Sequence, residues 1–409
     1  MVDPKHESFS PLMQTGLLPQ EEMLEIGRKQ KKLIIGIPKE NQKTEKRIGL
    51  TPEAVEILVE DGHEVILERG AGEGVHYTDT AYSEMGGFIV DDKRKVLNAD
   101  IIIKASPFTL SEIEDLKGNQ LLLSPLQIIQ RIPDYFRKLM QKKITAVAFE
   151  SIMNEHGCYS IQQSMHAISG SVSINIASEL LSNSQHGGKG KGILLGGISG
   201  ITPTEVVILG AGTAAEYAAR AAIGYGAFVR VFDTSPQRLE EFQQRLGQRV
   251  YTSIFHPKVF KKALVSGDVL IGAIEMPKTK LHYLVSEDMV KTMKKGAVII
   301  DLNIDEGGCI ETSECRTIVE PLYERFGVIH YCVANITSKV ARTASIALSN
   351  VLYPIILKAG NSGGAKAFLR YNAGVRQGVY IYNGILTSEL IGNQFNIPYK
   401  DIDLLMAAF

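Results

Sequence analysis

The chain has 409 residues, of which 44% are hydrophobic and 22% are charged. This composition is typical of globular proteins and disfavours a largely disordered chain. The 44 Lys and Arg residues nearly balance the 45 Asp and Glu residues, for a net charge of −1, which disfavours a protein that coats nucleic acid. At roughly 100–200 residues per domain, the length predicts two or three domains.

Cysteine usage and hydropathy exclude further classes. The four cysteines are too few for a disulfide scaffold and form no C-x-x-C pair, so we expect reduced thiols, no bound metal and a cytoplasmic location. No uncharged apolar run reaches the ~18 residues of a membrane helix, and the N-terminal segment has no apolar core typical of a secretory signal. We therefore expect no membrane partner.

Residues 1–31 are predicted to be an N-terminal extension. The segment PQEEMLEIGRKQKK places acidic residues early and basic residues late, as the dipole of a helix favours. We interpret it as a surface helix or an arm on a neighbouring subunit, with a regulatory or targeting role as the alternative.

From Leu33 onward, apolar runs typical of strands alternate with helical patterns. LIIGIP, HEVILE, ADIIIKAS, LLLSP and ITAVAFE are the expected strands of a first α/β unit that ends near Glu150. MHAISGSVSINIASELLSN follows as a connecting helix, whose small residues allow close packing. A second α/β unit runs from Glu205 to about residue 335, and the remainder is predicted to be mostly helical.

The segment TEVVILGAGTAAEYAARAAIGYGAFVRVFD carries the strongest motif. It reads strand, G-x-G-x-x-A turn, helix and strand, which is the order of a dinucleotide-binding unit. Gly210 permits the tight turn, Gly212 lets the backbone approach a diphosphate, and Ala215 keeps the helix close to the strand. A purely structural glycine turn is the alternative.

Asp233 ends the second strand, at the position of a ribose-binding acid. Its carboxylate accepts from a 2′-hydroxyl and repels a 2′-phosphate, so NAD is the expected cofactor, although Arg238 nearby leaves NADP open. The strand DVLIGAI brings Ala273 to the same crevice, because ligands of such sheets bind beyond the carboxyl ends of the strands.

Several segments resemble the family of alanine dehydrogenase and the alpha subunit of proton-translocating transhydrogenase. They are IGIPKENQKTEKRIGLTPEAVEILVEDGHEVILERGAGEGVHYTDTAYSEMGG, GKGILLGGISGITPTEVVILGAGTA, GAVIIDLNIDEGG and YCVANITSKVARTASIALSN. Together they cover about residues 33 to 390, and the order of the last two favours the alanine dehydrogenase branch.

The resemblance implies an oxidoreductase that converts L-alanine reversibly to pyruvate and ammonia with NAD, by hydride transfer between Cα and the nicotinamide. It implies an α/β fold of two Rossmann-like domains, with parallel sheets flanked by helices, a discontinuous substrate domain and assembly as a homo-oligomer, commonly a hexamer. We expect the substrate domain at residues 32–165 plus 341–409 and the NAD-binding domain at residues 166–340, connecting helix included.

The resemblance also assigns roles to particular residues. Arg47 matches the arginine that binds the substrate carboxylate, a task that suits the guanidinium fork, although a salt bridge to Glu45 or Glu40 is the alternative. Asp305 matches the catalytic aspartate beside the nicotinamide. Asn335 matches the asparagine near the nicotinamide, and both residues are expected to contact substrate or cofactor.

Two expected catalytic positions depart from the family. Where the family has two lysines, the first is kept as Lys104 but the second is Ser106, and the family's acid/base histidine is replaced by Gln127. Glutamine carries no proton as imidazole does. We expect Lys104 to polarise the substrate oxo group, and the proton-carrying group to be Asp305, Lys104, His166 or water.

Two other functions stay open. One is a transhydrogenase-like module that binds NAD(H) without turning over an amino acid, since such modules also lack the lysine–histidine pair. The other is a related dehydrogenase for a different amino or oxo acid, because Ser106 and Gln127 change the pocket.

Overall fold

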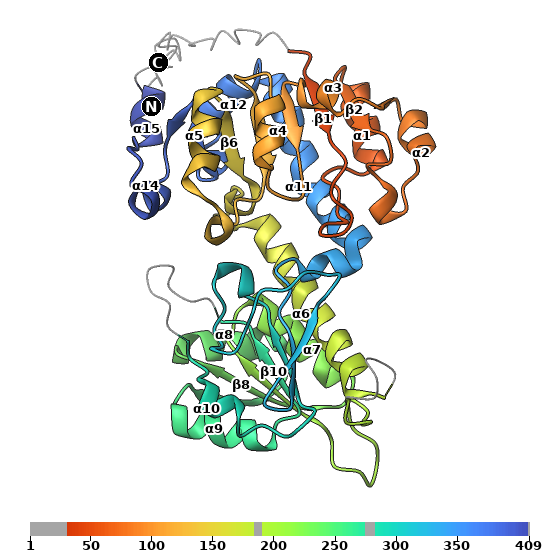
Figure 1. Ribbon diagram of the computed structural model, residues 1–409, viewed down its shortest axis with the longest axis vertical. Coiled ribbons are helices and arrows are strands. Elements are labelled where there is room, and N and C mark those ends of the chain that lie inside the picture. The colour runs from red at the N-terminus through yellow and green to blue at the C-terminus, as the bar shows by residue number, and fades with distance from the viewer. Residues whose placement is uncertain (1–30, 184–189, 275–282, 408–409) are drawn as a thin grey trace, which may run out of the picture.

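The computed structural model describes residues 31–183, 190–274 and 283–407, so the predicted N-terminal extension lies outside the described residues except for Lys31. Two α/β domains stand one above the other, with two long helices between them (Figure 1). Each domain is built on its own sheet. The expected fold class, with mostly parallel sheets flanked by helices, is confirmed.

The upper domain contains an eight-stranded sheet within the described residues, in the order β15-β14-β6-β5-β4-β1-β2-β3. Its strands β1 to β6 are parallel. They span Ile34–Ile37, Glu64–Glu68, Phe88–Val90, Ile101–Ile103, Leu121–Ser124 and Thr145–Ala148. The central β4, β5 and β6 are fully buried, as the apolar runs predict for strands covered on both faces.

Short helices and turns connect these strands. They are α1 (Pro52–Glu60), η1 (Glu73–Val75), α2 (Asp79–Glu84), α3 (Lys93–Leu97), α4 (Leu110–Asp115), η2 (Ile128–Gln130), α5 (Pro133–Gln141) and η3 (Phe149–Ser151). Local sequence fixes their starts. The Thr51 side chain accepts from the Ala54 amide and Pro52 occupies the first turn of α1, while Thr109 and Glu112 form a capping box on α4.

The lower domain repeats this strand order. Its sheet, seven-stranded in the described part of the chain, runs β12-β13-β11-β10-β7-β8-β9, and only β12 is antiparallel. The strands β7 to β13 span Glu205–Leu209, Phe228–Asp233, Tyr251–Ile254, Val269–Gly272, Val298–Asp301, Leu322–Arg325 and Val328–Tyr331. The helices are α7 (Thr213–Gly224), α8 (Pro236–Leu246), α9 (Pro257–Ser266) and α10 (Glu287–Val290), with η5 at Ile304–Glu306.

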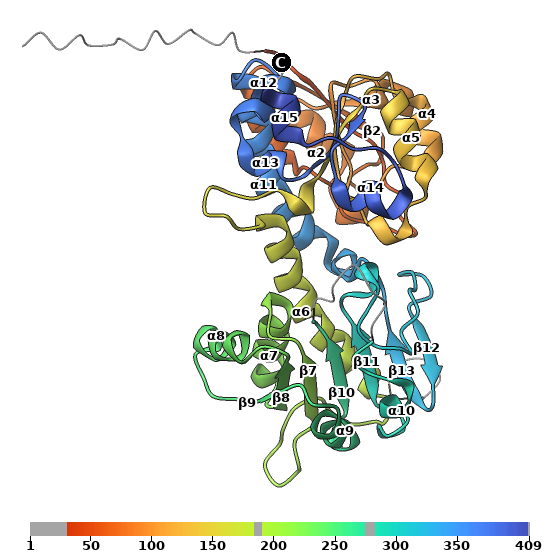
Figure 2. The same ribbon diagram turned by 90° about the vertical axis from the view of Figure 1, so that its left-hand side faces the viewer.

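In both sheets the order in which successive strands are added reverses once. The reversal lies between β1 and β4 in the upper domain and between β7 and β10 in the lower domain. Open sheets of this kind bind ligands in the crevice at that switch point, beyond the carboxyl ends of the strands. The fold thus offers two crevices, and Figure 2 shows α6 passing between the domains that hold them.

Two helices join the domains: α6 (Ser160–Leu181) and α11 (Ala341–Asn361), the latter preceded by η6 (Ile336–Val340). The expected close packing of the small residues is confirmed where α6 meets α7. A Cβ added to Gly170 would lie 2.1 Å from the Ala214 carbonyl oxygen and 2.9 Å from the Ala218 nitrogen. No side chain fits there, so glycine fixes the separation of α6 and α7.

The C-terminal part was predicted to be mostly helical. It contains α12 (Ala365–Tyr371), α13 (Ala373–Arg376), α14 (Glu389–Phe395) and α15 (Ile402–Ala407), but also a hairpin of β14 (Val379–Tyr382) and β15 (Ile385–Leu386). The mostly helical character is confirmed, and the hairpin is an element that the prediction did not include. Asn383 and Gly384 connect the strands with φ of 47° and 80°, as a tight hairpin turn requires, and β14 joins the first sheet beside β6.

The hairpin makes the upper domain discontinuous, as expected from the resemblance. The exact domain boundaries at residues 165 and 340 stay a prediction; they fall within α6 and at the start of α11. By length and composition alone, the span Ile336–Asn361 could cross a membrane. Ala344, Leu348 and Leu352 of this span are fully buried, which also suits a core helix that contacts α1, α6 and α12.

Candidate active site

A cavity of about 1150 Å³ lies between the two domains. Its walls come from segments that follow β5, β6, β11 and β13, from α6, and from the C-terminal segment. Among its lining residues are Arg47, Gln127, Glu150, Met165, His166, Asp305 and Asn335. The carboxyl ends of both sheets thus meet in one space, which we call the substrate cavity.

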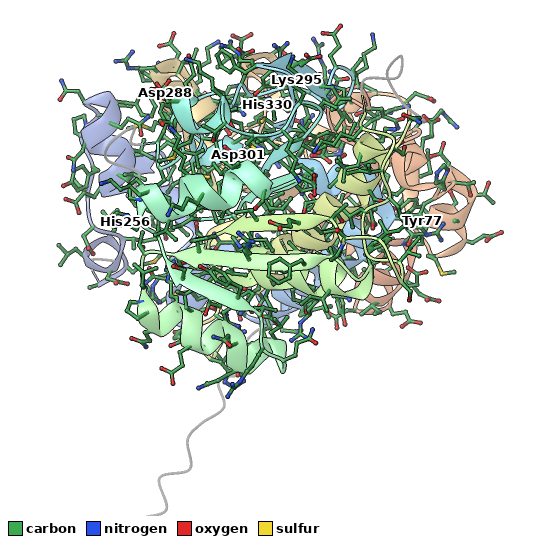
Figure 3. The ribbon with its side chains drawn as sticks, turned by 90° about the horizontal axis from the view of Figure 1, so that it is seen from below. Tyr77, His256, Asp288, Lys295, Asp301 and His330 are labelled. Atoms are coloured by element: carbon green, nitrogen blue, oxygen red, sulfur yellow. The ribbon has the colours of Figure 1, made fainter. Side chains whose placement is uncertain are left out.

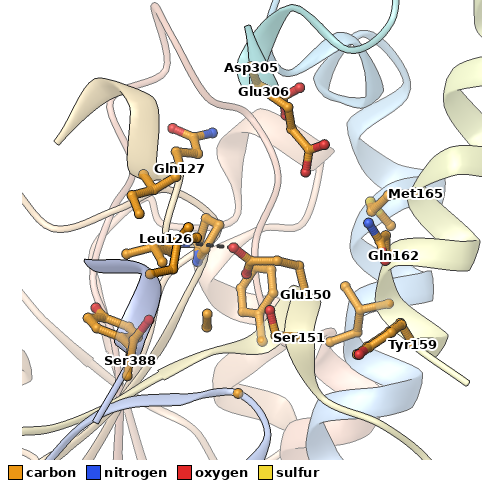
Figure 4. A pocket seen from close by; sticks show the side chains of 18 of the residues that line it. Leu126, Gln127, Glu150, Ser151, Tyr159, Gln162, Met165, Asp305, Glu306 and Ser388 are labelled. Atoms are coloured by element: carbon orange, nitrogen blue, oxygen red, sulfur yellow. Dashed lines mark hydrogen bonds between the residues drawn. The ribbon is translucent and has the colours of Figure 1, made fainter. Parts of the chain in front are cut away.

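Asp305 enters the substrate cavity from η5. Figure 4 shows Gln127, Glu150 and Glu306 around the same space, with Gln162 and Met165 entering from α6. Burial, aided by the negative charges of Glu306, Asp301 and Glu150, raises the pKa of Asp305 to about 7. A carboxyl group with such a pKa can give or take a proton near neutral pH.

Arg47 lines the substrate cavity but is already paired. Its Nε and Nη2 donate to the two carboxylate oxygens of Glu45 at 2.9 and 2.7 Å, and both residues are buried. Although burial opposes ionisation, the Arg47 charge holds the pKa of Glu45 below its ordinary value. The salt bridge that the sequence left as an alternative is therefore present.

The remaining donors of Arg47 have weaker partners. Nη2 also donates to the Ala105 carbonyl oxygen at 3.4 Å, and Nη1 donates to the Thr337 hydroxyl at 3.0 Å and to the Met165 sulfur at 3.6 Å. A thioether is a weak acceptor. Nη1 is thus the part of the guanidinium that a ligand carboxylate can engage at the lowest cost.

Lys104 is not among the residues that line the substrate cavity. Its Nζ donates to both carboxylate oxygens of Glu112 at 2.9 and 2.8 Å and lies 3.7 Å from Glu40. Despite burial, the charge and hydrogen bonds of Lys104 hold the pKa of Glu112 at about 2. Contact between Lys104 and a substrate requires this buried ion pair to open.

The two departures from the family have different surroundings. Glu40 accepts hydrogen bonds from the hydroxyl and amide of Ser106 and from the amide of Ala105. This serine therefore belongs to the network around Lys104. Gln127 lines the substrate cavity, where its backbone is left-handed with φ of 46°. The structure thus places a carboxamide beside Asp305 and no side chain of Ser106 in the lining.

Asn335 connects the two domains. Its amide nitrogen donates to the Thr44 carbonyl oxygen and to Glu45 at 3.2 Å, and it also lines the substrate cavity. Glu45 and Thr337 are functional candidates that sequence reasoning missed as such. For Glu45, the one available signal was an acidic residue two positions before Arg47, which does not by itself reveal a bidentate pair. For Thr337, the sequence offered no such signal.

A second cavity, of about 650 Å³, lies over the glycine turn after β7. It is lined by Gly212, Asp233, Arg238, Ala273 and neighbouring residues, and we call it the cofactor cavity. A Cβ on Gly212 would meet nothing within 4 Å, so the backbone here is open to a ligand. No side chain caps α7, which leaves its first amides to bind an anion.

Gly210 and Ala215 shape the turn from behind the cofactor cavity. Gly210 has φ of 117°, and a Cβ on it would lie 2.4 Å from the Ala273 carbonyl oxygen. Ala215 is fully buried. These residues, predicted to be cofactor-binding, thus stand where β7, α7 and β10 meet, and the cradle fits a dinucleotide diphosphate.

Asp233 is buried at the edge of the cofactor cavity. Its oxygens accept from the backbone amides of Ala211 at 2.8 Å and Ser235 at 2.9 Å. The carboxylate therefore holds the glycine turn in place, and each oxygen keeps a lone pair for a further donor. Arg238 lines the same cavity.

His330, which lines neither cavity, has a structural role. In Figure 3, His330 and Asp301 are seen within the lower domain. His330 Nδ1 donates to the Val328 carbonyl oxygen, Nε2 accepts from Thr312, and burial lowers its pKa to about 4. Among the described residues, no group of three His, Cys, Asp or Glu side chains could hold a metal.

The raised pKa of Asp305 predicts a pH-dependent cost to stability. An unfolded aspartate ionises near pH 4, whereas Asp305 stays protonated to about pH 7. The folded state then binds more protons, so the free energy of unfolding falls as pH rises from 4 to 7. Relative to wild type, Asp305→Asn should gain stability across this window, by up to about 4 kcal/mol.

The measurement is urea unfolding of both proteins at pH 4, 5.5, 7 and 8. Asp305→Glu, which keeps the ionisable group, is the matched control. A stability difference between Asp305→Asn and wild type that is constant with pH would contradict the raised pKa.

Comparison with known proteins extends over both domains. Residues 36–169 match the model of the alanine dehydrogenase/PNT N-terminal domain, and residues 173–389 match that of the C-terminal domain. The chain is 38% identical over 369 residues to an alanine dehydrogenase of Methanococcus maripaludis, covering 90% of this chain and 98% of the relative. It is 36% identical over 372 residues to one of Staphylococcus saprophyticus, covering 91% and 99%.

Solved structures give the same result. An L-alanine dehydrogenase superposes with a TM-score of 0.82 at 32% identity, covering 89% of this chain and 99% of that one. A transhydrogenase from Sinorhizobium meliloti shares the fold, with a TM-score of 0.71 at 20% identity over 87% and 99%. The chain therefore belongs to the alanine dehydrogenase/PNT family.

Proposed function

We propose that this chain catalyses the NAD-dependent, reversible oxidative deamination of L-alanine to pyruvate and ammonia. One observation carries the proposal: the cofactor cavity over the glycine turn adjoins the substrate cavity that Arg47 and Asp305 line, and His166 and Asn303 line both. A ring at the end of a bound dinucleotide would then face a small acid held near Arg47. The names of the curated relatives support this activity.

Arg47 is the proposed carboxylate-binding residue. Glu45 occupies Nε and one side of Nη2, so the substrate carboxylate binds at Nη1. There it replaces the Met165 sulfur, a weak acceptor, and accepts from Nη1 alongside the Thr337 hydroxyl. A charge-assisted hydrogen bond there is stronger than the thioether contact it replaces. Asn335, also in the lining, is proposed to help orient the substrate or cofactor.

Asp305 is the proposed catalytic carboxyl group. NAD, when bound, supplies the acceptor for the hydride that leaves Cα. Asp305 holds or takes a proton beside that centre, because its pKa of about 7 makes both forms available near neutral pH. Lys104 is proposed to position Glu40, which accepts hydrogen bonds from the Ala105 and Ser106 amides. Lys104 contacts the substrate directly only if its ion pair with Glu112 opens.

The test is turnover by the full chain with L-alanine and NAD at alkaline pH, followed by NADH absorbance. We expect activity, and Arg47→Ala should lower kcat/KM by about 100-fold or more through loss of the carboxylate contact while NADH binding is kept. Arg47→Lys, which keeps the charge without the fork, is the matched control. Normal turnover by Arg47→Ala would remove Arg47 from the site.

A second function has one observation in its favour. Lys104 is held by Glu112 and Gln127 stands where the family has a histidine, as in a module that binds NAD(H) without its own substrate chemistry. Tight NADH binding with no turnover of any amino or 2-oxo acid in a panel would favour that module. Turnover of another amino acid alone would identify a related dehydrogenase.

We propose NAD as the cofactor because Asp233 lines the cofactor cavity, where its carboxylate repels a 2′-phosphate. Asp233→Asn should weaken NADH binding about tenfold and narrow the preference for NADH over NADPH, as measured by fluorescence titration with both. Asp268→Asn, a substitution at a buried carboxylate away from both cavities, controls for general damage. An unchanged NADH dissociation constant would contradict the ribose role.

We propose a homo-oligomer, a hexamer by resemblance, located in the cytoplasm. The four cysteines are unpaired, which suits a reducing compartment. Leu194, Ile198 and Ile201 are 62%, 55% and 65% exposed on a loop that projects from the lower domain (Figures 1 and 2). Exposed apolar side chains gathered on one projecting loop suit an interaction site, and the proposed occupant is a second copy.

The double variant Ile198→Asp and Ile201→Asp should therefore reduce the oligomer to a smaller species in light scattering. Charges in a desolvated interface are unfavourable, while the exposed loop tolerates them in the monomer. Phe88→Asp, at an exposed apolar residue of the upper domain, is the control. An unchanged mass would exclude this loop from the interface.

A further inference from the structure

Helix α6 presents one residue to both cavities. The positions that line the substrate cavity follow helical spacing along one face: Ile161, Gln162, Met165, His166 and Ser169. Those that line the cofactor cavity lie on the adjacent face: Gln163, Ser164, His166 and Ala167. The two faces meet at His166.

The packing of α6 fixes where His166 stands. Gly170, one turn later on the same side of the helix, lies against the Ala214 carbonyl at the start of α7. Thr213 and Ala214 of that first turn line the cofactor cavity. His166 is thereby held over the beginning of α7, and His166 and Asn303 both line the two cavities.

The reaction needs a group that the expected positions do not supply. Deamination requires a base for the attacking water and an acid for the leaving amine. Gln127 carries a carboxamide, and Lys104 is bound to Glu112 outside the cavity lining. Asp305 provides one proton-carrying group. Among the described residues that line either cavity, His166 is the one histidine.

We propose that His166 is a catalytic residue that carries protons between water and the substrate nitrogen, in place of the imidazole that Gln127 lacks. The inference rests on the proposed function. After the hydride has left Cα with its electron pair, the substrate is an iminium ion. Neutral His166 takes a proton from water as the water oxygen bonds to Cα, and the product is a neutral carbinolamine.

The imidazolium then returns that proton to the amine nitrogen. The C–N bond breaks, its electron pair leaves with ammonia, and the hydroxyl proton passes to the Asp305 carboxylate as the carbonyl forms. Water and iminium thereby yield pyruvate, ammonia and one protonated Asp305, which balances atoms and charge. His166 thus handles the protons of the attacking water and of the leaving amine, while Asp305 takes the proton of the carbinolamine hydroxyl.

The test compares His166→Ala with two variants on the same helix. Gln162→Ala alters the substrate cavity alone, and Ser164→Ala alters the cofactor cavity alone. His166→Ala should lower kcat for L-alanine by about 100-fold or more, with the NADH dissociation constant within about threefold of wild type. Imidazole added to the buffer should restore part of the lost rate, because it can enter the space that opens when the His166 side chain is truncated.

A second-site variant gives an independent readout. Gln127→His in the His166→Ala background should also recover turnover, since it puts an imidazole on the opposite wall of the same cavity. If His166→Ala fails to fold, as judged by its melting temperature and NADH binding, His166→Gln takes its place in every comparison. It keeps a polar side chain of similar length and carries no proton.

Three outcomes overturn the inference while wild-type activity stands. They are a kcat near wild type, a loss of NADH affinity that accounts for the whole effect, and the failure of both imidazole and Gln127→His to restore any rate. A wild-type chain without turnover is a different result. It contradicts the proposed function itself, and the inference falls with it.

Discussion

A buried ion pair between Glu45 and Arg47 holds the two domains to one geometry. Glu45 lies on the loop after β1 and binds Arg47 through both oxygens. The same pair reaches the segment between β13 and α11, where Asn335 donates to Glu45 and Arg47 donates to Thr337. Breaking a buried pair by removing one partner typically costs about 3–5 kcal/mol, and this pair fixes the positions of the groups to which Asn335 and Thr337 bind across the substrate cavity.

The cofactor side depends on backbone instead of charge. Gly210 touches the end of β10, Gly212 faces open space, and Gly170 brings α6 against α7. Close backbone contacts exclude a side chain at Gly210 and Gly170, whereas Gly212 leaves the main chain open to a ligand. Together they put the amides of α7, the end of β10 and His166 around one cavity. A dinucleotide site arises where main chain can approach a diphosphate and where α6 closes the side toward the substrate.

Much of the fold could be predicted from sequence because its signals are local. The glycine turn, the buried strands and the small residues of α6 all depend on near neighbours in the chain, and Asn383–Gly384 was a local hairpin signal that the helical interpretation of the C-terminal part overlooked. Side-chain pairing was harder to foresee. Lys104 matches the family's lysine, but its ammonium group is paired with Glu112 on α4 and Glu40 after β1. No rule of sequence spacing predicts that these three side chains meet.

The Glu45–Arg47 ion pair constrains how a substrate carboxylate can bind. If a substrate displaced Glu45 from Arg47, a buried carboxylate would lose its bidentate partner and keep only the Asn335 amide and the backbone amides of Lys46 and Arg47. That loss is comparable to the whole free energy with which a small metabolite binds at millimolar concentration, about 4 kcal/mol. Binding at Nη1 gives up only the Met165 contact and part of the Thr337 contact. The ion pair therefore directs the substrate to the side of Arg47 that faces α6, which is the side on which His166 stands.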